Sequence, residues 1–460
     1  MKRFFSAPTM INLELTELCN VKCRHCYNFW RDENMGSVTM DREQVDRTVD
    51  RFHEARVFHV GLSGGEPFAK FDILEYAIHK FAEKGITINL NSSLMLATDE
   101  LIQRLAATGN IEHILTSLVS CSPAVTDFAM NQAGAFDRVV AGIKTTVRNG
   151  LRVSANMVVT RQTKDQVYDT AMLAAEIGCQ KMFVTRAVPP VYVDTSEEDN
   201  YTLTPEEVKK SLDDALQAKE DSGMMIGTLV SYPLCFLGDL RKYEDFVGRG
   251  CPSQSGNRMS INPDGEAHVC VHEDESYGNI FETPIQEIFQ KRARKWHDGS
   301  FHYSGCTGCE YLDVCEAGCR MIALGQNGDH TEKDPLFVGP NAVTRKLNTV
   351  RDSEIFEKMK SGFSFFAPKR LRFREEGGFY LLNIRWGNTL AVPWEVGEFL
   401  LKYRDSGAEF TLDDFGQKRQ DLLAYLFDKD AVESHYYLGR KRKNLEGLGL
   451  RIEDLDLVAV

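Results

Sequence analysis

The sequence lacks the features that would place the protein in a membrane, outside the cell or on nucleic acid. No hydrophobic run reaches the about 18 residues that a membrane-spanning helix needs, and no apolar segment of export-signal length precedes Pro8. Basic residues number 54 against 67 acidic ones, and the net charge of −13 offers no general attraction to phosphate. We therefore expect a cytoplasmic protein that has neither a membrane nor a nucleic acid as its partner.

Cysteine is absent from the last 141 residues, yet 12 cysteines precede them. In a reducing compartment these thiols are not explained by disulfide bonds. Nine of them form two dense groups, which indicates metal or cluster ligation, and the other three are Cys121, Cys179 and Cys235. The chain of 460 residues is 43% hydrophobic, which is enough for roughly three globular domains.

Residues 8 to about 220 alternate short β-rich runs with longer helical patterns, which is typical of a parallel sheet with helical crossovers. The predicted strands are residues 11–15, 57–62, 87–90, 113–118, 152–159 and 182–185. The predicted helices are residues 41–55, 72–84, 99–107, 136–149, 164–177 and 205–221. An open sheet and a closing barrel both fit this order, and in either one the chemistry belongs at the carboxyl ends of the strands.

Two further regions complete the chain, so that the predicted domains are residues 1–235, 236–345 and 365–460. The middle region is rich in cysteine, glycine and turns, and we expect metal ligation to replace part of its core. The last region opens with an alternation of arginines and apolar residues, at Arg370, Arg372 and Arg374. A strand there would carry three arginines on one face.

The first cysteine group follows the first predicted strand and consists of Cys19, Cys23 and Cys26. A loop of this length can ligate three irons of a 4Fe–4S cube. Because such clusters normally take four thiolates, the fourth iron would stay open to another ligand. The alternative is a zinc site completed by His25, but His25 lies inside the loop and is poorly placed to complete a tetrahedron.

This CxxxCxxC spacing, with the strand and helix order of residues 8–220, resembles the radical S-adenosylmethionine (SAM) enzymes. The resemblance implies an α/β fold, a partial (β/α)6 barrel. It also implies that SAM binds the open iron, and that one electron from a flavodoxin- or ferredoxin-type donor cleaves SAM to a 5′-deoxyadenosyl radical. The radical would abstract hydrogen from an unactivated carbon in a site that excludes water.

The same resemblance assigns the SAM contacts. The segment from Ser63 to Pro67 is similar to the family's GGEP motif, in which glycines permit close backbone approach and the acid meets the methionine ammonium group. The cofactor-binding residues implied are Gly64, Gly65, Glu66, Asn91, Ser117, Asn156 and Arg186. Asn91 lacks the family's following glycine, and Val119 stands where the family has aspartate. The alternative for the last four residues is an ordinary strand-end hydrogen-bonding role.

The second cysteine group resembles the SPASM extension of radical SAM enzymes. Cys251 is followed by 13 residues, Gly265, four residues and Cys270, and later come Cys306-x2-Cys309-x5-Cys315-x3-Cys319. The resemblance implies two auxiliary iron–sulfur clusters held by these six cysteines. A zinc ribbon, the alternative, would normally use two CxxC pairs, and this segment has one.

The family's final cysteine is missing, because Phe337 stands in its place. Even with Cys235 recruited, seven thiolates serve two clusters that would take eight. One auxiliary cluster is therefore predicted to have an oxygen or nitrogen ligand, with Asp313, His330 and Asp334 as candidates, or an open iron.

Cys121, after the fourth predicted strand, is the candidate catalytic residue. It could donate a hydrogen atom, as in peptide epimerases that resemble this family. The alternative is a small buried hydrophobic side chain, and this is also the interpretation of Cys179.

The pattern of three strands followed by helices over residues 369–430 resembles the peptide-recognition domains of ribosomal-peptide maturation systems, similar to the small pyrroloquinoline quinone chaperone. The resemblance implies a winged-helix-like α+β domain that adds the leader of a precursor peptide as a strand to a sheet edge. The arginine row would then attract an acidic leader, or form a solvated face that blunts the edge. The alternative is a structural cap with no ligand.

The prediction is a radical SAM enzyme that modifies a ribosomally made precursor peptide by cross-linking, through C–C, C–O or thioether bonds, or by epimerisation or desaturation. Two alternatives stay open at this point. One is radical chemistry on a small molecule or a haem or cofactor precursor. The other is a zinc-stabilised binding module with no enzymatic activity.

Overall fold

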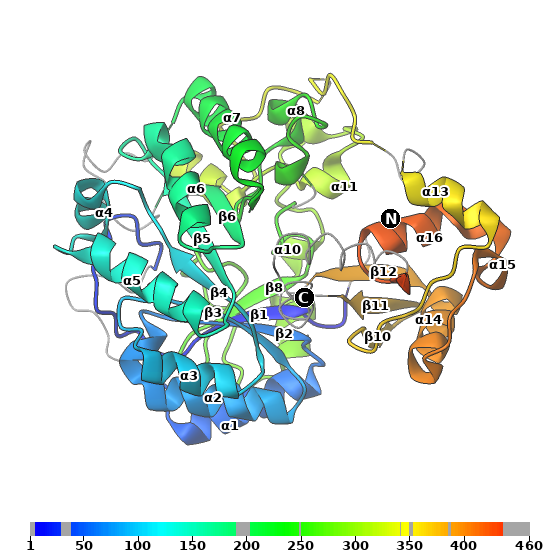
Figure 1. Ribbon diagram of the computed structural model, residues 1–460, viewed down its shortest axis with the longest axis horizontal. Helices are drawn as coiled ribbons and strands as arrows, with labels where there is room; N and C mark the ends of the chain where they lie inside the picture. The colour runs from blue at the N-terminus through cyan, green and yellow to red at the C-terminus, as the bar shows by residue number, and fades with distance from the viewer. Residues whose placement is uncertain are drawn as a thin grey trace. The chain divides into compact units, whose positions relative to one another are not determined.

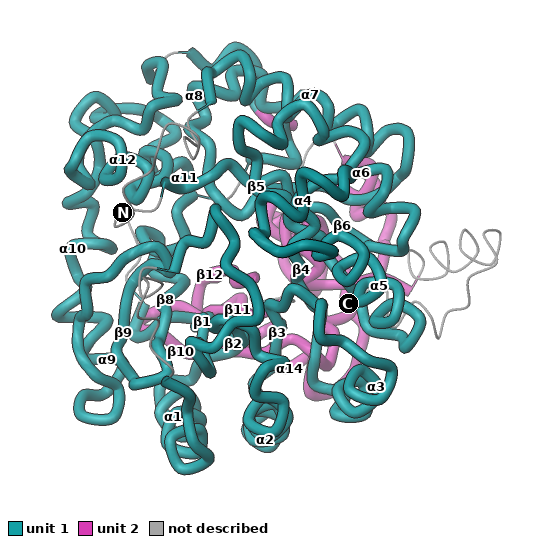
Figure 2. Tube along the Cα trace, turned by 90° about the vertical axis from the view of Figure 1, so that its left-hand side faces the viewer, with its two compact units in different colours: residues 1–346 teal, residues 347–460 magenta. Residues whose placement is uncertain are grey.

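In the computed structural model, the described residues are 5–28, 38–189, 203–247, 250–340, 342–348, 353–384 and 388–435. The chain forms two compact units, residues 1–346 and residues 347–460, drawn in teal and magenta in Figure 2. The predicted border between residues 235 and 236 lies inside the first unit, and that division stays a prediction. The predicted third domain lies inside the second unit, and its residues 436–460 lie outside the described residues.

The first unit is built on a nine-stranded sheet in the order β7-β6-β5-β4-β3-β2-β1-β8-β9. Its strands are β1 (Met10–Glu14), β2 (His59–Ser63), β3 (Thr87–Asn91), β4 (Ile111–Ser117), β5 (Val153–Val159), β6 (Lys181–Arg186), β7 (Met225–Gly227), β8 (Arg258–Ile261) and β9 (Ala267–His268). All neighbours are parallel except β8 and β9. The strands are mostly buried, as expected when a parallel sheet is covered.

Helices line the outer face of this sheet, as Figure 1 shows. They are α1 (Arg42–Glu54), α2 (Phe71–Glu83), α3 (Asp99–Ala107), α4 (Pro123–Met130), α5 (Ala135–Arg148), α6 (Val167–Glu176) and α7 (Pro205–Ser222). Each buries one apolar stripe against the strands. On α1 that stripe includes Val45, Val49 and Phe52, and the Phe52 ring lies 5.7 Å from the ring of Phe81 on α2.

The predicted α/β fold with a mostly parallel sheet is confirmed. All six predicted strands and all six predicted helices of residues 8–220 are present, with ends displaced by a few residues. The structure adds α4 and β7, which the sequence did not predict. Both are short, with eight and three residues, so neither carries enough hydrophobic periodicity to stand out.

The cysteine-rich segment is attached to the sheet by β8, which pairs in parallel with β1, Ile11 opposite Met259 and Leu13 opposite Ile261. Its helices are short: α8 (Leu234–Leu237), α9 (Ile285–Glu287), α10 (Arg294–His297), α11 (Leu312–Cys315) and α12 (Arg320–Asn327). A small hydrophobic cluster around Trp296 supports them. The segment therefore has a modest core of its own beside the edge of the barrel sheet.

The second unit contains a three-stranded antiparallel sheet in the order β10-β11-β12 and has a separate hydrophobic core. Its elements are α13 (Glu354–Lys358), β10 (Arg372–Glu376), β11 (Phe379–Asn383), β12 (Thr389–Pro393), α14 (Trp394–Ser406), α15 (Leu412–Phe415) and α16 (Gln420–Asp428). The predicted order of strands before helices is present. Among the described helices of both units, none is long and apolar enough to span a membrane.

The arginine row of this unit differs from the expectation of an open, basic strand face. Arg374 is only 1% exposed, and its Nε donates to the buried Glu376 carboxylate at 2.9 Å. Arg372 donates to the side chain of Asn383 at 2.7 Å, and Arg370 pairs with Glu433. All three guanidinium groups thus have partners within the unit, and Arg374 lies in its core while Arg370 and Arg372 are half-buried. The attraction of an acidic leader stays a prediction.

Candidate functional site

Most of the predicted SAM-binding residues lie at the carboxyl ends of neighbouring parallel strands. Asn91 is the last residue of β3, Ser117 of β4 and Arg186 of β6. Asn156 lies within β5, opposite Ser117 in the strand register, and its Oδ1 accepts from the hydroxyl of Thr185 at 2.7 Å. The sheet therefore brings these residues to one edge, where ligands of parallel α/β sheets bind. Their contacts with SAM stay predictions.

The loop that carries Cys19, Cys23 and Cys26 follows β1, and all three thiols are half-buried. It is held from one side by Arg24, whose amide donates to the Ala129 carbonyl at 2.8 Å and whose guanidinium lies 4.3 Å from the Phe128 ring centroid. The end of α4 thus fixes the middle of the loop.

From the other side, the loop is held by the backbone of the Gly-Gly-Glu segment. The Gly65 amide donates to the Thr16 carbonyl and the Glu66 amide to the Leu18 carbonyl, both at 2.7 Å. A Cβ on Gly65 would lie 2.2 Å from the Leu18 oxygen, and Gly64, with a φ of +138°, adopts a conformation that favours glycine. Only glycines permit this approach to the cysteine loop, whereas the contact of Gly64 and Gly65 with SAM stays a prediction.

The region where the cysteine loop meets the Gly-Gly-Glu segment has buried polar atoms that suit a bound polar group. The Asn28 amide donates to the Gly64 carbonyl at 3.3 Å, whereas its buried Oδ1 has no hydrogen-bond partner among the described residues. The buried Asn20 Oδ1, next to Cys19, is in the same situation. Buried polar atoms are normally satisfied, so two such atoms beside three thiols agree with a site that holds an iron–sulfur cluster and a polar cofactor.

Glu66 is 1% exposed and fully hydrogen-bonded by the protein. Its carboxylate accepts from the Ser92 hydroxyl at 2.7 Å, from the Ser93 amide at 2.8 Å and hydroxyl at 2.6 Å, and from the Phe68 amide at 3.2 Å. It therefore fastens the Gly-Gly-Glu segment to the end of β3. The predicted contact of Glu66 with the methionine ammonium group stays a prediction.

The seven cysteines from Cys235 onward separate into two groups in space. Cys235, Cys306, Cys309 and Cys315 line one cavity with an empty volume of about 370 Å³, which includes the space at its mouth. Cys251, Cys270 and Cys319 form the other group, in which the thiols lie close enough to raise one another's pKa. Among the described residues, no three His, Cys, Asp or Glu side chains lie close enough to share a single metal ion.

Burial favours the protonated form of several thiols in these two groups. It raises the pKa of Cys251 and of Cys306 to about 11, and it also raises the pKa of Cys270 and Cys319. Thiolates are the form that iron binds, so cluster formation here must release protons from buried thiols.

Three residues near the group of Cys251, Cys270 and Cys319 were not identified from the sequence. The Nδ1 of His272 lies 3.5 Å from the Cys270 sulfur, and burial lowers the pKa of His272 to about 4, so the imidazole is neutral. Its ring lies 5.0 Å from the ring of Tyr27, directly after Cys26, so the two cysteine regions meet here. Arg258, at the start of β8, interacts electrostatically with Cys251 and Cys270. No spacing motif includes these residues.

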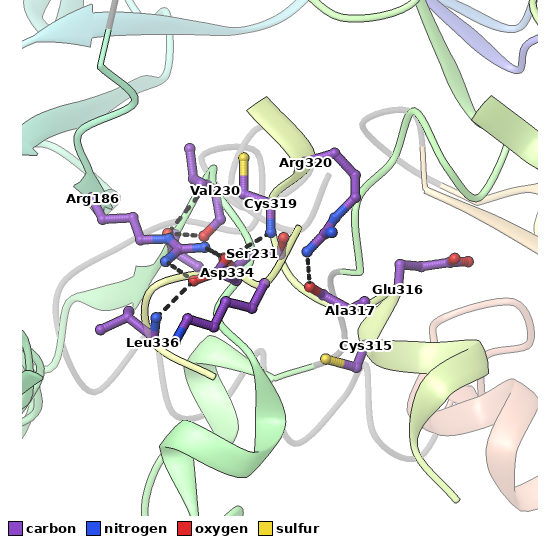
Figure 3. Close-up of polar contacts among 12 residues, drawn as sticks. Arg186, Val230, Ser231, Cys315, Glu316, Ala317, Cys319, Arg320, Asp334 and Leu336 are labelled. Carbon is purple, nitrogen blue, oxygen red and sulfur yellow. Dashed lines mark hydrogen bonds and ion pairs between the residues drawn. The ribbon is translucent and has the colours of Figure 1, made fainter. Parts of the chain in front are cut away.

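Arg186 connects the end of β6 to the cysteine-rich segment (Figure 3). Its guanidinium donates to both carboxylate oxygens of Asp334, at 3.0 Å to Oδ1, and to the Ser231 carbonyl at 2.7 Å. Asp334 also accepts from the Cys319 amide at 2.9 Å. Burial opposes the ionisation of Asp334, but Arg186 and the backbone amides of Cys319 and Leu336 hold its pKa below the usual range.

These contacts bear on the candidates for a non-thiolate ligand. Asp334 is committed to Arg186 and to the backbone amides of Cys319 and Leu336. The His330 ring stacks on Phe301, with centroids 4.8 Å apart, and Asp313 is exposed on α11. The structure places none of the three in the cavity lined by four thiols.

The remaining two cysteines lie in the barrel. Cys121 follows β4 and is half-buried, and its amide donates to the Thr170 hydroxyl on α6 at 2.9 Å. Its role as a hydrogen-atom donor stays a prediction. Cys179 is buried in the barrel core, where burial raises its pKa to about 12, in agreement with a small hydrophobic role.

Two parts of the chain match models of known protein families. Residues 13–174 match the model of the radical SAM superfamily, and residues 251–310 match that of the SPASM iron–sulfur cluster-binding domain. The chain therefore contains a radical SAM domain and a SPASM iron–sulfur cluster-binding domain, and it is an enzyme. SAM and iron–sulfur clusters are the cofactors that these two domains imply. The second match supports iron–sulfur ligation over the zinc alternative.

Similar proteins act on more than one kind of molecule. An AdoMet-dependent heme synthase of Methanosarcina barkeri is 27% identical, over 72% of this chain and 97% of its own length. The mycofactocin maturase MftC of Mycolicibacterium smegmatis is 26% identical, over 69% of this chain and 79% of its own. The structure of Streptococcus suis SuiB bound to its precursor peptide SuiA has a TM-score of 0.58 and 17% identity, and the match covers 74% of this chain and 76% of SuiB. It shows a shared fold.

Proposed function

We propose that this protein is a radical SAM peptide maturase, which modifies an unactivated carbon of a ribosomally made precursor peptide. Bound SAM supplies the 5′-deoxyadenosyl radical that abstracts the hydrogen atom. Cys19, Cys23 and Cys26 hold the SAM cluster, and the strand-end residues around Asn91 and Ser117 orient the cofactor. The second unit binds the leader of the precursor.

The main support for a peptide as the substrate is the presence of a separate second unit. The heme synthase matches over almost its full length yet covers 72% of this chain, so this chain carries sequence beyond that relative. Residues 347–460 form a compact unit with its own core and a small antiparallel sheet, in which β10 and β12 are the edge strands. Adding a strand to such an edge is a common mode of peptide recognition.

Hydrogen exchange of the full-length protein tests this binding mode. Short peptides encoded beside the gene are added, and amide exchange is followed by mass spectrometry. Protection of residues 372–376 or 389–393, the two edge strands, is expected on binding, while α1 and α2 of the first unit serve as internal controls. A precursor that is modified on co-expression yet protects neither edge strand would contradict the leader site.

Mass measurement of the co-expressed peptide tests the reaction itself. Cross-linking and desaturation remove hydrogen mass from the peptide, whereas epimerisation leaves its mass unchanged and is seen by exchange of deuterium from solvent. The absence of any modified peptide, with SAM cleavage intact, would contradict the proposal.

A second candidate, chemistry on a haem or cofactor precursor, is favoured by the 27% identity to the heme synthase. It predicts that the second unit is dispensable for turnover. Porphyrin-type substrates incubated anaerobically with the reconstituted enzyme, SAM and a reductant would be modified under this alternative and unchanged under the first.

A further inference from the structure

The cavity lined by four thiols draws on two distant parts of the chain. Cys235 lies on α8, at the start of the cysteine-rich segment, whereas Cys306, Cys309 and Cys315 belong to the later CxxCxxxxxC run. The Leu234 amide donates to the Cys315 sulfur at 3.5 Å, so the start of α8 is in direct contact with the run. Cys235 also interacts electrostatically with Cys306 and Cys315.

The position at which the family has its last cysteine also faces this cavity. Phe337 is one of the lining residues, and its ring packs edge-on against Tyr303 with centroids 5.1 Å apart. A phenyl ring has no atom that can ligate iron, so Phe337 cannot replace the family's last cysteine as a ligand. Cys235, whose thiol belongs to another lining residue of the cavity, is the available fourth donor.

The rest of the lining suits a cluster. Leu234, Leu312 and Ala317 are apolar, and an apolar shell shields a cluster from solvent. The Tyr311 hydroxyl, from another lining residue, is buried and has no hydrogen-bond partner among the described residues. An unsatisfied buried hydroxyl on a lining residue agrees with a bound group that accepts a hydrogen bond.

We propose that Cys235 completes a four-thiolate iron–sulfur site with Cys306, Cys309 and Cys315, in place of the missing downstream cysteine. It follows that the second auxiliary cluster is held by the three thiols of Cys251, Cys270 and Cys319 and has one iron without a cysteine ligand. The cluster that lacks one thiolate ligand is thus the one held by these three cysteines, beside His272 and Arg258. This assignment rests on the iron–sulfur content of the proposed function and is independent of the substrate.

Iron content and spectroscopy of the full-length protein test the assignment. In a parent variant with Cys19, Cys23 and Cys26 changed to Ala, only the auxiliary clusters form, about eight irons per chain. Adding Cys235→Ala is expected to remove or alter one cluster, with up to half of the iron lost and one of two reduced-state EPR signals changed. The matched control is Cys179→Ala, a barrel cysteine outside both groups, which is expected to leave iron and spectra as in the parent.

A Cys235→Ala protein that keeps the iron content and both EPR signals of the parent would overturn the assignment. Restoration of the lost iron by adding Phe337→Cys to the Cys235→Ala protein would support it, since that thiol faces the same cavity.

Thiol alkylation of the unaltered protein gives a second measurement that does not depend on a variant folding. Under anaerobic conditions, Cys235 is expected to resist iodoacetamide together with Cys306, Cys309 and Cys315, and to react at least tenfold faster after chelation removes the clusters. Cys121, half-buried and outside both groups, is the reference thiol. Equal reactivity of Cys235 before and after chelation would contradict its role as a ligand. Neither measurement involves a peptide, so a wrong substrate assignment would leave these results unaffected.

Discussion

Gly65 is the residue at which a single added carbon would affect the SAM site most directly. Its missing side chain allows the backbone of the Gly-Gly-Glu segment to meet the loop that carries Cys19, Cys23 and Cys26. A Cβ at this position would lie 2.2 Å from the Leu18 carbonyl oxygen, and no rotamer change can relieve a contact with backbone.

We predict that Gly65→Ala displaces the cysteine loop, at a cost of about 1–3 kcal/mol of local strain, and lowers SAM cleavage at least tenfold. The measurement is 5′-deoxyadenosine formed anaerobically with SAM and dithionite, together with iron content. Gly377→Ala is the control, because a Cβ there would meet no atom within 4 Å. Equal activity of the two variants would show that the close approach is not required.

Also at the residue scale, the ion pair of Arg186 and Asp334 joins the barrel to the backbone of Cys319, with side chains 7% and 0% exposed. Arg186→Met would leave a buried carboxylate without its cation, so we predict a loss of about 3–5 kcal/mol in the free energy of unfolding. The exposed pair of Arg148 and Asp99, with side chains 61% and 55% exposed, is the control. Arg148→Met is expected to cost at most about 1 kcal/mol. Denaturant unfolding monitored by circular dichroism compares the two, and similar losses would contradict the prediction.

At the scale of elements, the cysteine-rich segment depends on its ligands more than the barrel does. Its α8, α10 and α11 have only four residues each, too few to be stable alone, whereas α1 of the barrel has 13 residues and a capping box at Asp41. Metal ligation supplies folding free energy in such segments.

We predict that anaerobic removal of iron with a chelator increases amide exchange in α11, α12 and the Cys251–Cys270 region while α1, α2 and α5 stay protected. Hydrogen exchange before and after chelation is the measurement, and reconstitution with iron and sulfide should restore the protection. A uniform increase over the whole barrel would instead show that the clusters support the entire first unit.

For the whole molecule, the two units have separate cores, so each is expected to fold alone. We predict that a protein ending at residue 346 keeps SAM cleavage but no longer modifies its precursor peptide. Mass spectrometry of peptide and 5′-deoxyadenosine from the same reaction separates the two outcomes. Full turnover without the second unit would favour the small-molecule alternative.

A point variant provides the same test in the intact chain. The buried pair of Arg374 and Glu376 lies wholly within the second unit. Arg374→Met should destabilise this unit by about 3–5 kcal/mol, lowering peptide modification but not SAM cleavage. Its control is Arg419→Met, which removes an exposed pair with Glu395. Equal effects of the two variants would contradict a role for the buried pair.

Much of the fold could be predicted because it is encoded locally. The period of apolar residues placed six strands and six helices of the barrel, and the capping boxes at Asp41 and Thr204 agree with two of the predicted helix starts. Segments without a local signal were missed, namely α4 and β7, and the pairing of β8 with β1 was also missed because it joins residues far apart in the chain. The burial of Arg374 was also missed, because its pairing with Glu376 in the core depends on how the strand packs.

The chemical character of the site is encoded in short stretches of sequence: the spacing of Cys19, Cys23 and Cys26, the glycines that approach that loop, and a cysteine supply one short of two four-thiolate clusters. Spacing is a local property, so it can be read without coordinates. Only the tertiary structure decided which thiols share a cavity and that Asp334 is bound to Arg186, 148 residues away. Such pairings depend on how β6, α8 and the cysteine run pack together, and this long-range packing leaves no periodic trace in the sequence.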